Sequence, residues 1–166
     1  MTLKDALREG VKAELAPMLR GHGFRGTLPT WRLRNDAGDW AIVNLQSSQW
    51  NSADGLTLVL NIAVAPAAWL RWLKDPGRAA SRPTASDGVY QERLYPTGAA
   101  DDDDVWWSVT SEGGAVAAVR DMTERLRVEG VPRLVRLLDH AELVAELREQ
   151  GHHPDGYVGG WLRSLD

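Results

Sequence analysis

Residues 40–65 read WAIVNLQSSQWNSADGLTLVLNIAVA, and this stretch decides the fold. Ala41, Val43 and Leu45 recur at every second position within Trp40–Gln49, and apolar side chains lie along one face from Leu56 to Ala65, which is typical of strands. Between them, Trp50 to Gly55 combine Asn, Ser, Asp and Gly, the residues that favour turns. The stretch therefore predicts two antiparallel strands joined by a short turn.

The flanking sequence adds further strands. Apolar and basic residues alternate in Thr30–Arg34, and the turn at Asn35–Asp39 joins this segment to the strand that begins at Trp40. Farther along the chain, Val89–Tyr95 and Val105–Thr110 have the composition of a fourth and a fifth strand. We expect an antiparallel sheet of about five strands whose first three form a meander.

Helical spacing of apolar residues marks the rest of the chain. We expect a helix from Thr2 to Gly21 that Pro17 distorts in its last turn, a short helix after Pro66, a helix over about 115–128 that Gly130 breaks, a helix that starts at Pro132, and a last helix from Asp139 to before Gly151. The order of these elements predicts the α+β class, with helices packed mainly on one face of the sheet.

Length and composition predict one domain over residues 1–166. Within it, residues 76–88 are rich in Pro, Ser, Ala and Gly, which predicts an exposed, mobile loop. Residues 151–166 form a C-terminal tail, a loop up to Gly160, and Trp161 and Leu162 are expected to pin this tail to the body. The chain contains no cysteine, which excludes disulfides, thiolate zinc sites and thiol nucleophiles.

The net charge of −4 argues against nucleic acid as a partner, because phosphate neutralisation requires a basic excess. No apolar run approaches the roughly 20 residues that span a bilayer. The N-terminal residues include acids and lack an apolar signal core. We therefore expect a cytoplasmic protein that binds neither nucleic acid nor membranes.

Familiar catalytic and cofactor motifs are missing from the sequence. There is no Gly-x-Ser-x-Gly turn, no Gly-x-Gly-x-x-Gly and no phosphate-binding loop, so we expect no cofactor and assign no catalytic residue. Consecutive acids at Asp101–Asp104 do not converge on one cation, and the sequence 152–155 (HHPD) lacks the helical spacing that preorganises histidine ligands. We expect no metal site at either place.

One face of the predicted sheet is the candidate site. If the turn centres near Ala53, Leu45 lies opposite Ile62 and Gln46 lies opposite Asn61. Pairing through residues 35–39 then places two arginines on the same face as Trp40 and the amides. With Arg93 from the fourth predicted strand, the candidate ligand- or partner-binding residues are Arg32, Arg34, Trp40, Asn44, Gln46, Ser48, Asn61 and Arg93.

Arginine binds carboxylate or phosphate with a planar fork and stacks on aromatic rings, and amides bind donors and acceptors together. Such a face suits a small polar or anionic ligand or an acidic patch on another protein. The alternative is an ordinary solvated face, since antiparallel sheets often leave one face in water.

Several short motifs resemble a known family. Gly23-Phe24, Asn44-Leu45-Gln46 with Ser48, Asn61, Arg93, Trp106-Trp107 and Pro132 are similar to the bacterial family called domain of unknown function 4304. The resemblance covers roughly residues 3–150 and omits the 76–88 loop and the tail. It implies a compact bacterial domain, and it implies no activity or catalytic residue.

These observations lead to a functional hypothesis: a non-catalytic binding or interaction module that uses the Arg, Trp and amide face. Alternatives stay open. One is a small-molecule-binding enzyme, hydrolase-like, assembled from Arg93, Glu92 and a histidine. Another is an immunity-like protein that masks a toxin, and a third is a homodimer in which two sheets meet.

Overall fold

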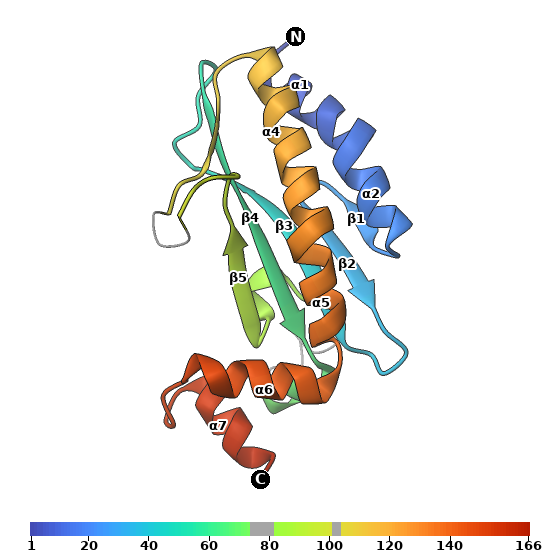
Figure 1. Cartoon of the computed structure of the whole chain (residues 1–166), viewed down its shortest axis with the longest axis vertical. Coiled ribbons are helices and arrows are strands. Elements are labelled where there is room, and N and C mark those ends of the chain that lie inside the picture. The colour runs from blue at the N-terminus through green and yellow to red at the C-terminus, as the bar shows by residue number, and fades with distance from the viewer. Residues whose placement is uncertain (74–81, 101–103) are drawn as a thin grey trace.

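The computed structural model describes residues 1–73, 82–100 and 104–166 (Figure 1). The strands are β1 (Arg25–Thr27), β2 (Thr30–Arg34), β3 (Trp40–Ser47), β4 (Leu56–Ala65), β5 (Tyr90–Leu94) and β6 (Trp107–Val109). The helices are α1 (Leu3–Gly10), α2 (Ala16–Gly21), α3 (Ala67–Trp72), α4 (Glu112–Arg125), α5 (Val131–Leu137), α6 (His140–Gln150) and α7 (Tyr157–Ser164). Two π turns, η1 (Val11–Leu15) and η3 (Leu126–Gly130), continue α1 into α2 and α4 into α5, and a 3-10 turn, η2 (Ala85–Asp87), precedes β5.

The predicted α+β fold is confirmed. The sheet is antiparallel in the order β1-β2-β3-β4-β5, and β6 pairs with β4 as well. One face of the sheet lies under α1, α2, α4 and α5, while α6 and α7 lie beyond its end (Figure 1). β2 and β4 have the predicted bounds. β1 was not predicted, because three exposed residues with a central glycine give no periodic signal.

The register corrects one prediction. Leu45 lies opposite Leu60 rather than Ile62, and Asn61 lies opposite Asn44 rather than Gln46. Ser52 does pair with Gly55 across the turn, as predicted, but residues 49–51 form a bulge opposite the single residue Leu56 between that pair and the Ser48–Thr57 pair. The bulge adds two residues on the β3 side of the turn relative to the β4 side. Because the shift is even, every side chain keeps its predicted face.

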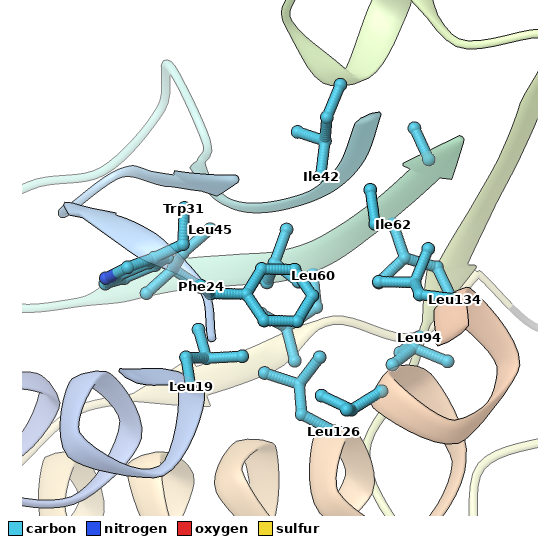
Figure 2. Packing of buried hydrophobic residues seen from close by; sticks show 14 of the residues in the cluster. Leu19, Phe24, Trp31, Ile42, Leu45, Leu60, Ile62, Leu94, Leu126 and Leu134 are labelled. Carbon is cyan, nitrogen blue, oxygen red and sulfur yellow. The ribbon is translucent and has the colours of Figure 1, made fainter. Parts of the chain in front are cut away.

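The core fills the space between the sheet and the helices that cover it. In α1, η1 and α2 the buried residues include Leu7, Val11, Leu15 and Leu19. Figure 2 shows Leu19, Phe24, Leu60 and Leu126 meeting in this layer. Each buried leucine or phenylalanine contributes about 1.5–3 kcal/mol relative to an exposed one, so this interface dominates the stability of the fold.

Both π turns precede a proline. Pro17 and Pro132 cannot donate to the residues four positions earlier, Ala13 and Val128, and their rings crowd those carbonyls. Each π turn contains the crowded carbonyl and widens the helix there, so the helix continues past the proline. The predicted break at Gly130 is therefore wrong.

The C-terminal part confirms one expectation and corrects another. Asp139 caps α6 by accepting from the Glu142 N–H at 3.1 Å, and Gly151 ends the helix at φ 72°. The tail forms α7 from Tyr157 onward, where a loop up to Gly160 was predicted. Trp161 is only 1% exposed and contacts Trp69 edge to face, with ring centroids 5.7 Å apart, so it pins the tail as expected.

The predicted loop over 76–88 falls partly on residues 74–81, which lie outside the described residues. Its described part lies on the outer face of the sheet, where Pro83 and residues 87–88 are buried while Arg82, Thr84 and Ser86 are exposed. Asp87 is 7% exposed, and its carbonyl accepts from the Trp69 indole N–H at 2.8 Å. Beneath this segment Ile42 and Ala63 are fully buried, and Figure 2 shows Ile42 on the other side of the sheet from Leu60.

Candidate functional site

The outer face of the sheet, opposite the main helical layer, carries the candidate residues. Arg32 pairs with Ile42 in β3, and alternation along β3 places Asn44 and Gln46 on the same face as Ile42. Asn61 lies between Asn44 and Arg93 across the neighbouring strands. The structure thus brings Arg32 and Gln46 to one side of the sheet, as parity predicted.

Residues 82–87 cross this face and separate two hollows. The first, which we call the amide hollow, has a volume of about 450 Å³ and opens to solvent over β3, β4 and β5. Its polar lining includes Asn44, Gln46, Asn61, Ser86, Gln91 and Arg93. Four of these six side chains are carboxamides, so the hollow presents both donors and acceptors.

The carboxamides form a ladder across the strands. Asn61 donates to the Gln46 Oε1 at 2.9 Å and to the Asn44 Oδ1 at 3.3 Å, and Asn44 donates to the Thr30 hydroxyl at 3.1 Å. These bonds fix the amides in place. Within the described ranges, the Gln46 NH₂ and the Asn61 Oδ1 keep no protein partner and are free to bind a ligand.

Arg93 closes one end of the amide hollow. Its guanidinium lies 5.4 Å from the Trp106 ring centroid and contacts the Asp104 carboxylate at 3.1 Å. Hydrogen bonds from the Trp106 indole and the Tyr95 hydroxyl, together with the charge of Arg93, hold the pKa of Asp104 below its usual range. Asp104 neutralises Arg93, so this hollow is polar rather than strongly positive.

The second hollow, which we call the arginine hollow, has a volume of about 380 Å³ and lies over β1, β2 and the start of β3. It is lined by Arg25, Arg32, Arg34 and Arg82 together with Trp40. Arg34 lies over the Trp40 ring, 5.4 Å from its centroid, and the Arg32 Nε donates to the Pro83 carbonyl at 2.7 Å. The guanidinium groups are thus oriented by an aromatic ring and by the backbone.

The structure divides the predicted site residues between the two hollows. Asn44, Gln46, Asn61 and Arg93 line the amide hollow, while Arg32, Arg34 and Trp40 line the arginine hollow. Ser48 lines neither, because its hydroxyl accepts from the Trp50 N–H at 3.2 Å in the turn.

Sequence reasoning missed several lining residues. Thr84, Ser86 and Arg82 come from the segment that was expected to be a mobile loop, and Arg25 comes from the unpredicted strand β1. Gln91 shares a face with Arg93 by alternation in β5, so parity alone could have identified it.

Glu92 and Arg93 point to opposite faces of β5. The Glu92 carboxylate lies toward α5, where Arg133 and the Tyr90 hydroxyl both donate to it. Burial, and then the Glu92 carboxylate, raise the pKa of Tyr90 well above its usual value. An acid-base pair built from Glu92 and Arg93 is therefore not assembled on either face.

The other titratable motifs lie away from both hollows. The His153 ring accepts from the Asp155 N–H at 3.1 Å, and His152 contacts Gln150 at 3.0 Å. Residues 101–103 of the acidic run lie outside the described residues. In the described part of the chain, no group of three or more His, Asp or Glu residues has the geometry to hold a metal.

None of the described helices has the length and apolar character that crossing a bilayer requires.

A family model with the description "Domain of unknown function (DUF4304)" matches residues 15–136, well over half of the chain. The match agrees with the resemblance in the sequence motifs. No curated protein and no solved structure gives a significant match.

Proposed function

We propose that this chain, which belongs to the DUF4304 family, is a non-catalytic binding module whose amide hollow holds a small polar ligand. The observation that carries the proposal is the hydrogen-bonded ladder of Asn44, Asn61 and Gln46 on the floor of a hollow of about 450 Å³. That volume lies within the range of about 300–1,000 Å³ typical of small-molecule sites.

The preorganised amides support a ligand rather than a flat protein partner. An amide ladder fixed before binding costs little ordering entropy when the ligand arrives. The face is also concave there, and Trp40, a candidate anchor for a protein partner, is half-buried beneath Arg34. A flat protein interface would favour an exposed aromatic residue at its centre.

The chemistry of the lining supports binding without catalysis. The carboxylate of Glu92, the acidic residue in the lining, is held on the other side of the sheet by Arg133. The Thr84 hydroxyl contacts Ser86 and donates to Asp87 at 3.0 Å, so it serves the turn that shapes the wall. Glu92 and Thr84 thus serve the structure around the hollow, and the free amide groups of Gln46 and Asn61 contact the ligand.

Side-chain amide NMR tests the proposal directly. The chain has four asparagines and four glutamines, and half of these eight amides, at Asn44, Gln46, Asn61 and Gln91, line the hollow. We expect at least one compound in a panel of amino acids, dicarboxylates, sugars and nucleosides to shift the NH₂ signals of these four. The amides of Asn35, Gln49, Asn51 and Gln150 serve as internal controls in the same spectrum.

The Asn61→Leu variant is the matched loss-of-function test. It keeps the side-chain size and removes both N–H groups of the ladder, so the affinity of the compound should fall by about tenfold or more. Gln49→Leu, outside the hollow, should leave the affinity unchanged. If no compound in the panel shifts the four amides, or if Asn61→Leu binds as well as wild type, the proposal is wrong.

A further inference from the structure

The arginine hollow concentrates positive charge on a protein whose net charge is −4. Arg25 and Arg32 are direct cross-strand partners in β1 and β2. Like charges opposite each other on neighbouring strands destabilise a sheet. Arg82 lines the same hollow from the segment that crosses the face, and its charge acts on Arg32, so arginines from three separate segments line one hollow.

Within the described residues, no carboxylate forms an ion pair with the arginines that line this hollow. In residues 1–73, 82–100 and 104–166, none of Arg25, Arg32, Arg34 and Arg82 forms an ion pair, whereas Arg93 and Arg133 each contact a carboxylate. Burial, and then the charge of Arg82, lower the pKa of Arg32, and the charge of Asp87 only partly opposes them. The repulsion is thus felt at Arg32.

We propose that the arginine hollow is a binding site for a tetrahedral oxyanion, the phosphate group of a small phosphorylated molecule. A phosphate dianion between Arg25, Arg32 and Arg82 converts their mutual repulsion into charge-assisted hydrogen bonds. Arg32 is already held by Pro83 through its Nε, which leaves its outer N–H groups for the anion. Arg34 on Trp40 forms the fourth wall.

The proposal rests on different residues from those of the amide hollow, so the two stand or fall separately. The hollow of about 380 Å³ holds a phosphate group with room for the molecule that carries it. The oxygens of a tetrahedral phosphate point in several directions, so pairs of them can bind the guanidinium groups of four arginines. The two oxygens of a planar carboxylate can bind fewer of these guanidinium groups.

The test is titration with inorganic phosphate at constant ionic strength, followed by calorimetry and by arginine Nε–H NMR signals. Wild-type protein should bind phosphate and sulfate, and it should bind acetate more weakly. Arg25→Gln with Arg82→Gln should lower phosphate affinity by at least about tenfold. Arg8→Gln with Arg120→Gln removes the same charge from the helical layer and should change the affinity less than twofold.

Several results would overturn the proposal. The first is that wild-type protein does not bind phosphate, and the second is that it binds acetate as tightly as phosphate. The third is an equal loss of phosphate affinity in the two double variants, which would indicate diffuse charge attraction. General stabilisation by excluded phosphate acts on all variants alike and is removed by the comparison between them.

A stability measurement separates binding from a structural role. In chloride buffer, Arg25→Gln with Arg82→Gln should unfold at the same or a higher temperature than wild type, because like charges have been removed. In phosphate the order should reverse. A lower Tm of this variant in chloride would show that these arginines hold the fold together, and would contradict the repulsion on which the inference is built.

Discussion

Asp121, a side chain of the helical layer, fixes the connection between strands β5 and β6. It lies in α4 and accepts from the Thr97 N–H at 3.0 Å, from the Thr97 hydroxyl, and from the Trp107 indole N–H at 2.8 Å. Burial alone would raise the pKa of Asp121, but these hydrogen bonds outweigh burial and hold the pKa below its ordinary value near 3.8.

Asp121→Asn should therefore destabilise the protein in a pH-dependent way. A carboxyl group whose pKa is lowered by folding adds stability above its unfolded pKa, and this stability is lost as the pH falls through the folded pKa. At pH 7 we expect a loss of about 1 kcal/mol, at the low end for a charged acceptor because solvent screens it. Urea unfolding at several pH values measures this loss.

The sign of the pH effect distinguishes this cause from a packing change. The difference in stability between wild type and Asp121→Asn should narrow as the pH falls below the unfolded carboxyl pKa of about 3.9 and then through the lowered pKa of Asp121 in the folded protein. Asp155→Asn, whose carboxylate lies 3.9 Å from Arg163 on an exposed loop, is a control with little expected effect. A difference that stays constant to acid pH would contradict the account.

Between elements, the Glu92–Arg133 pair joins the edge strand β5 to α5. Both side chains are about one-third exposed, and Tyr90 donates to the same carboxylate. The pair faces the helical layer, away from both hollows. Its role is to hold β5, and with it Arg93 and Gln91, in position beside the amide hollow.

A double-mutant cycle measures this link. Arg133→Met should cost about 1–3 kcal/mol, because it leaves the half-buried Glu92 carboxylate without its cation. Arg133→Met combined with Glu92→Gln should cost less than the sum of the single changes. Arg136→Met in the same helix, where the Arg136 side chain is 45% exposed in its pairs with Glu142 and Glu146, should cost less than about 1 kcal/mol. Strict additivity in the cycle would refute the link.

At the scale of the whole molecule, an aromatic cluster connects the C-terminal helix to the outer face. Trp161 contacts Trp69 and His140, and Trp69 stacks on Trp72 at 5.7 Å. The Trp69 indole also holds the Asp87 carbonyl in the segment that separates the two hollows. The tail and the candidate site therefore belong to one packing unit.

Trp161→Ala should destabilise the whole protein by about 3–5 kcal/mol, because it leaves a cavity beneath α7. Tyr157→Ala in the same helix, where the ring is 76% exposed, should change stability by less than about 0.5 kcal/mol. Calorimetry of both variants measures the contrast. Similar small losses in both would show that α7 is only loosely attached.

Much of the fold was predictable from periodicity. β2 lies at the predicted residues because its side chains alternate strictly, and β4 does because Leu58, Leu60, Ile62 and Val64 share one face. An even register shift left the faces intact. This is why seven of the eight predicted site residues line one of the two hollows. The bulge at residues 49–51, which adds two residues relative to the facing segment, could not be predicted, because the whole segment has the composition of a turn.

What remained hidden depends on contacts distant in sequence. Nothing local indicates that η2 packs against β3 and β4, because that segment has the composition of a loop. Its covering of the face made two hollows from one predicted surface. Arg25 and Arg82 became partners of Arg32 only through a short edge strand and this crossing segment.

The π turns at Val11–Leu15 and Leu126–Gly130 have a consequence for length variation in this chain. Each inserts one residue beyond what an α-helix of the same rise would contain, and this keeps Leu7, Val11, Leu15 and Leu19 in phase at intervals of four. Deleting one residue within either π turn would close it to an α-helical turn and leave the helix beyond it in phase, whereas a deletion in the flanking α-helix would rotate everything beyond it by about 100°. Closing the turn would bring the proline ring against the carbonyl four residues earlier, so such a deletion is tolerable only if the proline is replaced as well.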